Sequence, residues 1–340
     1  MPEFDLTALD ITTCEMHTGG EPVRIIESGY PPILGDTILD KRRYVKEHLD
    51  HLRTALMFEP RGHFDMYGVI QVKADLPGAD MAVLFMHNEG YSTMCGHATL
   101  ALGRYAVDKG LVEVSEGQNI VNLQTPCGMV QVYVDVKDGK AGTVHFHSVP
   151  AFAFKLDAVI NTRDYGPVTL DIGYGGAFYA FVSADNFGLD VRTSPTRDLI
   201  DVASMITREV KAQIPLSHPH DDDLAFLYGT ILTDGQDSYS MDATANICVF
   251  ADRQVDRSPT GSGVTARIAL QHKRKLIKIG QIRQFESITG DIFKAHVLNE
   301  TTCGPYPAVR VDVSGKAYYI GKNRYSFDAD DPLIKGFLLK

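Results

Sequence analysis

Short runs of β-branched and aromatic residues dominate the pattern of apolar and polar positions along the chain. Most have the length and alternation of β-strands and end at Gly, Asp or Pro. Examples are MYGVIQVKA, MAVLFMHN, GMVQVYVDV, TVHFHSV, VTLDIGYGGAFYAFV, LYGTILTD, ANICVFAD, AVRVDVSG and AYYIG. Helical patterns are fewer: about Lys41 to Leu56, the residues after Cys95, about Ser194 to Lys211, and the residues after Thr260. Because strands outnumber helices and do not alternate with them regularly, a doubly wound parallel sheet fits poorly.

Two parts of the chain resemble each other. A Gly-Gly pair leads into a strand at Gly19-Gly20 and again 156 positions later, at Gly175-Gly176. Cys95 follows the first pair after 75 residues, and Thr260 follows the second after 84. The shared order and similar separations indicate two copies of one design. Coincidental glycine-rich turns are the alternative interpretation.

Both copies contain the start of an apolar helix. Ser258 is a natural N-cap and Pro259 suits the first helical position. By the same alignment Thr93 caps the first helix, which places Cys95 and Thr260 in the first turns. The following segments, ATLALGRYAV and VTARIAL, are apolar on nearly every face. We therefore expect two buried helices.

A cysteine at the start of a helix is a candidate catalytic residue. Free N–H groups and the helix dipole attract anions there, so we expect a lowered pKa for the Cys95 thiol. His97 could add a donor or a proton, and glycines at 96, 261 and 263 allow a ligand close to the backbone. Such a thiolate could act as nucleophile or general base. The alternative is that Cys95 is only a small buried residue.

Composition narrows the class of protein. The 340 residues predict about two domains, and 44% hydrophobic with 22% charged residues is typical of a globular protein. The net charge of −10 argues against a nucleic-acid partner. No basic leader or long apolar run indicates a signal peptide or a membrane partner. Five cysteines without C-x-x-C spacing favour a reducing compartment, and we expect a cytoplasmic protein.

Histidines and glycines elsewhere in the chain give only weak indications of a metal site or a dinucleotide site. His145 and His147 share one face of a strand and could bind a metal, but no third ligand is evident. We interpret them as rim or packing residues and expect no metal. The stretch 218–223 is interpreted as a solvated acidic loop, and Gly261-x-Gly263 lacks the third glycine of a dinucleotide site.

Four segments, MCGHATLALG, MHTGGEPVRI, YGGAFYAFV and DRSPTGSGVTARIAL, resemble the proline racemase family, which also holds hydroxyproline epimerases and a dehydratase branch. The resemblance covers essentially the whole chain. It implies two opposed cysteines that act as acid and base across the substrate Cα. Cys95 matches the first, but Thr260 stands at the second position. That substitution, with FEPRGH, HNEGYS and LAFLYGTILTDG, resembles the dehydratase branch; FEPRGH and HNEGYS suggest pocket walls.

The resemblance also implies a fold. We expect an α/β protein of two pseudo-symmetric domains like diaminopimelate epimerase, each a mixed barrel-like sheet around a central helix. The active site would lie in the cleft between them. The N-terminal domain, 1–164, would carry Cys95 and be joined by a C-terminal tail of about 311–340. The second domain, 165–310, would carry Asp256 and Thr260. A homodimer is expected by the same resemblance.

The threonine at position 260 limits which reaction the site can perform. A threonine is not titratable near neutral pH, so it cannot deliver a proton to the second face of Cα. A hydroxyl on the neighbouring carbon is a suitable leaving group, and the resemblance to the dehydratase branch implies the substrate: we expect dehydration of trans-3-hydroxy-L-proline to Δ1-pyrroline-2-carboxylate, with Cys95 as proton acceptor and no cofactor. The N–H groups of Gly96, His97, Gly261 and Ser262 would hold the carboxylate of this imino acid.

The substrate ammonium needs an anionic partner. Asp256 matches the family position for that role, assisted by His97, although a turn or capping aspartate is the alternative. Two other functions stay open: a proline or hydroxyproline racemase or epimerase that uses one cysteine and water, and an inactive imino-acid-binding protein. Cys95 argues against the inactive protein, and Thr260 argues against racemisation.

Overall fold

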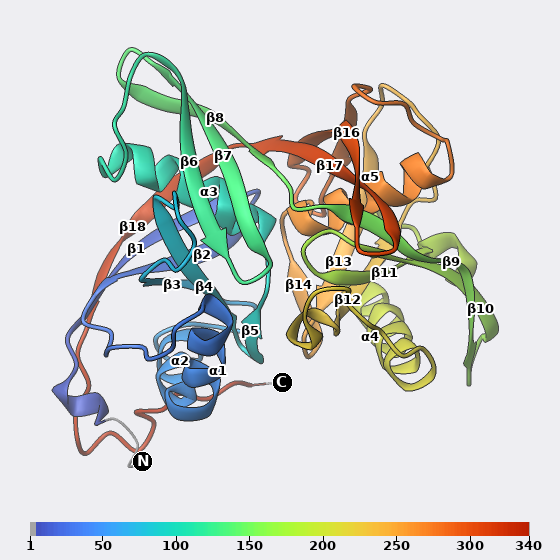
Figure 1. The fold of residues 1–340 in the computed structure, drawn as a ribbon. Coiled ribbons are helices and arrows are strands. Elements are labelled where there is room, and N and C mark those ends of the chain that lie inside the picture. The colour runs from blue at the N-terminus through green and yellow to red at the C-terminus, as the bar shows by residue number, and fades with distance from the viewer. Residues whose placement is uncertain (1–4, 340) are drawn as a thin grey trace.

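The computed structural model describes residues 5–339, so residues 1–4 and 340 of the expected domains lie outside it. In that range the chain forms 18 β-strands and five α-helices. Figure 1 shows two halves side by side, with α3 in one and α5 in the other. The α/β fold of two similar halves that we expected is confirmed.

The first half is built from strands that precede residue 148. They are β1 (Ile11–Thr18), β2 (Glu21–Ser28), β3 (Tyr67–Val72), β4 (Met81–His87), β5 (Gly90–Ser92), β6 (Gly117–Thr125), β7 (Gly128–Lys137) and β8 (Lys140–His147). Pairing runs β1–β2–β3–β4–β6–β7–β8, with β5 as a short hairpin on β4. The β2–β3 and β4–β6 pairs are parallel, so the sheet is mixed.

The second half repeats this order. Its strands are β9 (Ala151–Thr162), β10 (Gly166–Tyr174), β11 (Phe178–Ser183), β12 (Leu227–Thr233), β13 (Thr244–Phe250), β14 (Gln254–Asp256), β15 (Arg283–Glu286), β16 (Ile292–Cys303) and β17 (Tyr306–Gly315). Pairing runs β10–β11–β12–β13–β15–β16–β17–β9 and returns to β10, which closes an eight-stranded barrel. The two Gly-Gly pairs occupy equivalent turns, β1–β2 and β10–β11.

Two segments cross between the halves. The end of β17 pairs with β8, and the chain then enters β18 (Ala317–Tyr325), which pairs with β1. This crossing is the red ribbon that runs from β18 to β17 across the upper part of Figure 1, below the green hairpin of β7 and β8. In the other direction β9 follows β8 and pairs with β10 and β17. The expected domain boundary at residue 164 stays a prediction, although β9 already pairs with the second half.

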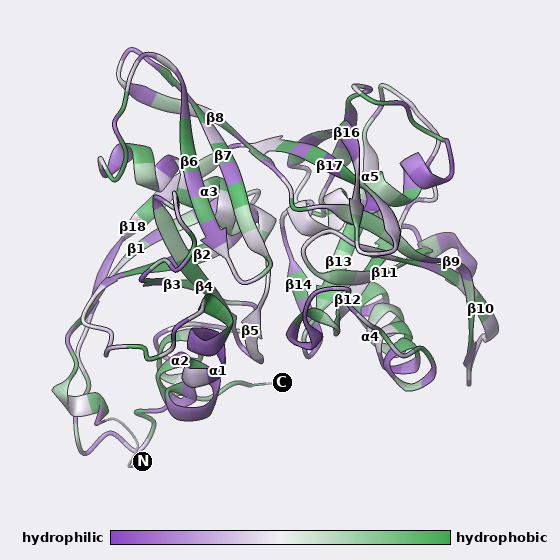
Figure 2. Ribbon diagram, in the orientation of Figure 1, coloured by the Kyte–Doolittle hydropathy of each residue, from purple (hydrophilic) through white to green (hydrophobic). Residues whose placement is uncertain are grey.

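Each barrel surrounds one helix, α3 (Gly96–Asp108) or α5 (Gly261–Lys273). Eleven of 13 residues are buried in each, because most side chains are small or apolar; in α5 the buried set also includes Arg267 and Gln271. The expectation of two buried helices is confirmed. The apolar residues concentrate on the strands around them (Figure 2).

Three further helices lie outside the barrels. The predicted helix 194–211 is α4 (Thr196–Gln213). The predicted helix 41–56 is two helices, α1 (Ile38–His48) and α2 (Asp50–Met57), because Leu49 leaves the helical region with φ −124° and ψ 13°. Asp50 restarts the helix and pairs with Arg53 at 2.7 Å. None of the helices in residues 5–339 is long and apolar enough to cross a membrane.

Candidate active site

The N-termini of α3 and α5 meet backbone to backbone at the junction of the two halves. A methyl group on Gly96 would lie 2.4 Å from the Cα of Gly261, and one on Gly261 would lie 2.8 Å from the Cα of Gly96. Real Cβ atoms do not approach that closely, so only glycine fits at either position. The two glycines therefore set the distance between the helix starts.

The helix caps differ from the sequence-based prediction. Cys95 and Thr260 are themselves the N-caps, and the Cys95 Sγ accepts from the Ala98 N–H at 3.4 Å. Thr93, expected as a cap, donates to the Gly176 carbonyl oxygen at 2.8 Å. Ser258, the other expected cap, accepts from the Thr260 N–H at 3.1 Å in the preceding turn. The helices start later than predicted because the approach of two glycines, invisible in local sequence, selects the starting point.

A small, nearly filled cavity of about 10 Å³ lies beside this contact. Cys95 lines it from the first half and Thr260 from the second. Of the sequence-predicted site residues, Gly96, His97, Asp256 and Ser262 also line it, while Gly261 forms the helix contact described above. The structure thus brings all seven together, although the two groups are separated by more than 150 positions of sequence.

The environment of Cys95 corrects the expected pKa. Burial raises the pKa of the Cys95 thiol well above its usual value, and the negative charge of Asp256 adds to the rise. The hydrogen bond from the Ala98 N–H lowers the pKa of the thiol, but by less than burial raises it. The predicted lowering is therefore wrong, because the thiol is 5% exposed and loses the hydration on which a thiolate depends. Its Sγ lies 3.1 Å from His97 Nδ1. Burial lowers the pKa of His97, which leaves a neutral imidazole.

Asp256 ends β14 with its carboxylate between a turn and the cavity. Oδ1 accepts from the Ser258 N–H at 2.8 Å, and Oδ2 lies 4.0 Å from His97 Nδ1. The turn role considered in the sequence is therefore present. The turn occupies Oδ1 of Asp256 and leaves Oδ2 beside His97.

Thr260 has a strained backbone. Its φ is 66° and its ψ 84°, in the left-handed region that β-branched residues rarely adopt. The side chain is 3% exposed and lines the cavity. Such strain persists only where the surrounding structure enforces it, and it is concentrated at functional sites.

Two carboxylates missed by the sequence analysis support the Asp256 segment from the first half. Glu21 accepts from the Arg257 N–H at 2.8 Å, and burial raises its pKa well above the usual value. Asp65 accepts from the Val255 N–H at 3.0 Å and pairs with the Arg257 guanidinium at 3.0 Å. Glu21 belongs to the quoted MHTGGEPVRI motif, but no local pattern separates it from a surface residue.

The aromatic side chains that line the cavity were also missed by the sequence analysis. Tyr67, Tyr179, Tyr228 and Phe250 line the cavity, and the Tyr179 hydroxyl lies 2.7 Å from Ser262 Oγ. Each belongs to a strand run that looks like ordinary core. The segments 58–63 and 87–91, expected as pocket walls, do not line it among the described residues. Asn88 instead bonds Gln254 of β14 and so joins the halves.

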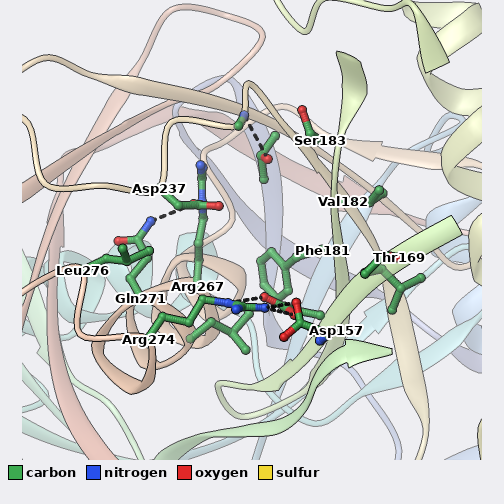
Figure 3. Close-up of a pocket in the computed structure, with 15 residues that line it drawn as sticks. Asp157, Thr169, Phe181, Val182, Ser183, Asp237, Arg267, Gln271, Arg274 and Leu276 are labelled. Carbon is green, nitrogen blue, oxygen red and sulfur yellow. Dashed lines mark hydrogen bonds and ion pairs between the residues drawn. The ribbon is translucent and has the colours of Figure 1, made fainter. Parts of the chain in front are cut away.

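A second cavity lies against the C-terminal half of α5, between β10 and β11 (Figure 3). Its charged groups pair with one another. Arg274 bonds Asp157 at 2.6 Å and Asp171 at 2.7 Å, and Arg267 bonds Asp237 at 2.8 Å. None of the sequence-predicted site residues lines this cavity. We therefore assign the candidate active site to the cavity at the helix starts.

Comparison with known proteins agrees with this geometry. The sequence pattern of the family described as Proline racemase matches residues 13–338. A Xenopus tropicalis protein named trans-L-3-hydroxyproline dehydratase is 59% identical, covering 100% of this chain and 98% of its own. A Burkholderia multivorans protein named 3-hydroxyproline 2-epimerase is 44% identical, covering 97% and 98%.

A solved structure extends the comparison to the fold. The hydroxyproline epimerase from Agrobacterium vitis, solved with bound trans-4-hydroxy-L-proline, superposes with a TM-score of 0.93 at 27% identity. The match covers 99% of this chain and 96% of that one. The resemblance found in the sequence is thereby confirmed. The chain belongs to the proline racemase family.

Proposed function

We propose that this protein dehydrates trans-3-hydroxy-L-proline to Δ1-pyrroline-2-carboxylate. The observation that carries the proposal is the asymmetry of the cavity: a cysteine faces it from one helix start and a threonine from the other. The name of the 59% identical relative supports the same reaction. A protein with one thiol base can remove the Cα proton, but a threonine opposite cannot return one.

The elimination is proposed to be syn. In trans-3-hydroxy-L-proline the Cα hydrogen and the 3-hydroxyl lie on the same ring face, opposite the carboxylate. Cys95 takes the Cα proton, the C–H electrons form the Cα–Cβ double bond, and the 3-hydroxyl on the same face leaves as water with the proton that the Cys95 thiol now carries. The resulting enamine tautomerises to the imine. No electrons are transferred to or from the substrate, so the chemistry requires no redox cofactor.

The thiol must lose its own proton before it can act as a base. His97 Nδ1 lies 3.1 Å from Sγ and belongs to a neutral ring, so it is placed to accept that proton. The substrate ammonium then brings a positive charge into the cavity and favours the thiolate that burial disfavours. Binding of the correct zwitterion thus activates the base.

The carboxylate is proposed to bind at the helix starts. The first two N–H groups of a helix have no acceptor within it, which leaves those of Gly96, His97, Gly261 and Ser262 available. Both helix dipoles are positive at this point. Donors in these positions also stabilise the negative charge that develops when Cα is deprotonated.

Asp256 is proposed to bind the ring ammonium through Oδ2. Asp256→Asn removes the charge and keeps the shape, so we expect KM for trans-3-hydroxy-L-proline to rise about 10- to 100-fold, the value of a charged hydrogen bond, with a smaller change in kcat. Steady-state kinetics measure both. Asp242→Asn, on an exposed loop, is the matched control. An unchanged KM would remove Asp256 from the binding site.

Epimerisation of 3-hydroxyproline is the second candidate, because a 44% identical relative bears that name. The test offers L-proline, trans-4-hydroxy-L-proline and trans-3-hydroxy-L-proline, and follows imine formation and optical rotation. The proposal expects imine from the 3-hydroxylated substrate alone and no change of configuration in the others. Optical inversion without imine would favour the epimerase.

We also propose a homodimer in the cytoplasm. Among the described residues β18 pairs only with β1, and its apolar Tyr318, Tyr319 and Ile320 are 47, 38 and 62% exposed. An apolar edge strand of this kind is a surface that a second copy can cover. All five cysteines are free thiols, which supports a reducing compartment.

A further inference from the structure

Three histidines surround one carboxylate where the two halves join, away from the candidate active site. His145 and His147 extend from β8, Asp312 from β17 and His296 from β16. The strand pairing fixes this arrangement, because Asp312 lies opposite His147 on one side and His296 on the other. β8 and β16 belong to different halves, so the cluster spans the crossing visible in the upper part of Figure 1.

The cluster has the geometry of a metal site. One ligand atom each from His145, His147 and Asp312 lies within 4.8 Å of the others. His147 Nε2 is 3.4 Å from Asp312 Oδ2, and His145 Nδ1 contacts the same oxygen. Two ligands on a tetrahedral zinc ion lie about 3.4 Å apart, given bonds near 2.1 Å. His296 Nδ1 lies 3.9 Å from the other carboxylate oxygen, Asp312 Oδ1, and does not belong to this group of three ligand atoms.

Neighbouring groups hold the histidine rings in place. Tyr133 stacks on His145 with ring centroids 4.8 Å apart and contacts His147 at 4.3 Å. Gln118 lies 3.1 Å from His145 Nε2, the nitrogen that faces away from Asp312.

We propose that His145, His147 and Asp312 form a binding site for a divalent transition metal of the zinc class. Imidazole and carboxylate donors in this ratio suit zinc and its neighbours and do not suit calcium or magnesium, which prefer oxygen ligands. The sequence alone offers only the two histidines of β8; Asp312 is contributed by a strand 165 residues later. The bound ion would tie β8 of the first half to β17, the strand that crosses between the halves.

The test is titration of the full-length, chelator-treated protein with Zn²⁺ by calorimetry, and with Co²⁺ by visible absorption. We expect one ion per chain and Co²⁺ bands of a nitrogen and oxygen ligand set. His147→Ala and Asp312→Asn are expected to weaken binding at least about 100-fold. Activity on trans-3-hydroxy-L-proline, expected to be retained, reports that both variants are folded, and melting temperature without metal does so independently.

Two control variants distinguish this site from others. His272→Ala removes a histidine paired with Glu300 on another surface and should leave the affinity unchanged. Cys95→Ser tests whether the thiol and His97 bind the ion instead, and it too should leave the affinity unchanged. Failure of the wild-type protein to bind Zn²⁺, equal binding by His147→Ala and Asp312→Asn, or loss of binding in Cys95→Ser would each overturn the proposal.

Discussion

Cys95→Ser is expected to reduce kcat for trans-3-hydroxy-L-proline dehydration by about 10²- to 10⁴-fold, the usual contribution of a positioned proton acceptor. The serine hydroxyl occupies nearly the same space, but its far higher pKa prevents it from acting as a base. The carboxylate and ammonium contacts do not involve the sulfur, so the dissociation constant of the substrate should change by less than about tenfold. Stopped assays of imine formation and calorimetry measure the two quantities.

The matched control is Cys303→Ser, at the end of β16 and outside the cavity. It replaces another buried free thiol and should leave kcat within about twofold. A Cys95→Ser protein that keeps a tenth or more of wild-type kcat would contradict the assignment of the thiol as base. Equal losses in the two variants would point to a general effect of serine on folding.

Gly96→Ala is expected to have the second-largest effect. The added methyl group would lie 2.4 Å from Gly261 Cα, backbone that cannot rotate away, so the two helix starts must separate. A shift of about 1 Å in a reacting geometry costs on the order of 100-fold, and we expect such a loss in kcat/KM. Overpacking should also lower the free energy of unfolding by about 1–3 kcal/mol.

Gly142→Ala is the control for Gly96→Ala. This glycine lies in β8 with ordinary backbone geometry, and a methyl group there would have its nearest neighbour at 3.4 Å. Kinetics and urea unfolding of both variants should separate a specific effect at the helix contact from a general effect of alanine. Wild-type kcat/KM in Gly96→Ala would mean that the distance between α3 and α5 does not govern catalysis.

The sequence was sufficient to predict the parts of the fold that depend on local pattern. Helices apolar on all faces indicated α3 and α5, and the repeated Gly-Gly turns indicated two similar halves. The pairing of Cys95 with Thr260 across one cavity followed from that duplication. Leu49, which divides one predicted helix into two, carries no such signal, because leucine is a good helix former.

Features set by distant residues could not be predicted. The thiol pKa depends on burial by strands that are remote in sequence, so a rule based on the helix start gave the wrong direction. The true N-caps follow from the contact between Gly96 and Gly261. Glu21 and Asp65 gain their roles only because the second half places Val255 and Arg257 against them. The cavity tyrosines look like strand core until the barrels are assembled.

The central claim is that a single base opposite Thr260 produces elimination instead of inversion. Proton NMR of trans-3-hydroxy-L-proline turned over in heavy water tests it directly, with Thr260→Cys run beside the wild-type protein. The account predicts that the wild type forms Δ1-pyrroline-2-carboxylate and that recovered substrate keeps its Cα configuration, while Thr260→Cys also yields the Cα epimer. Cα exchange or inversion by the wild type without loss of the 3-hydroxyl would contradict it.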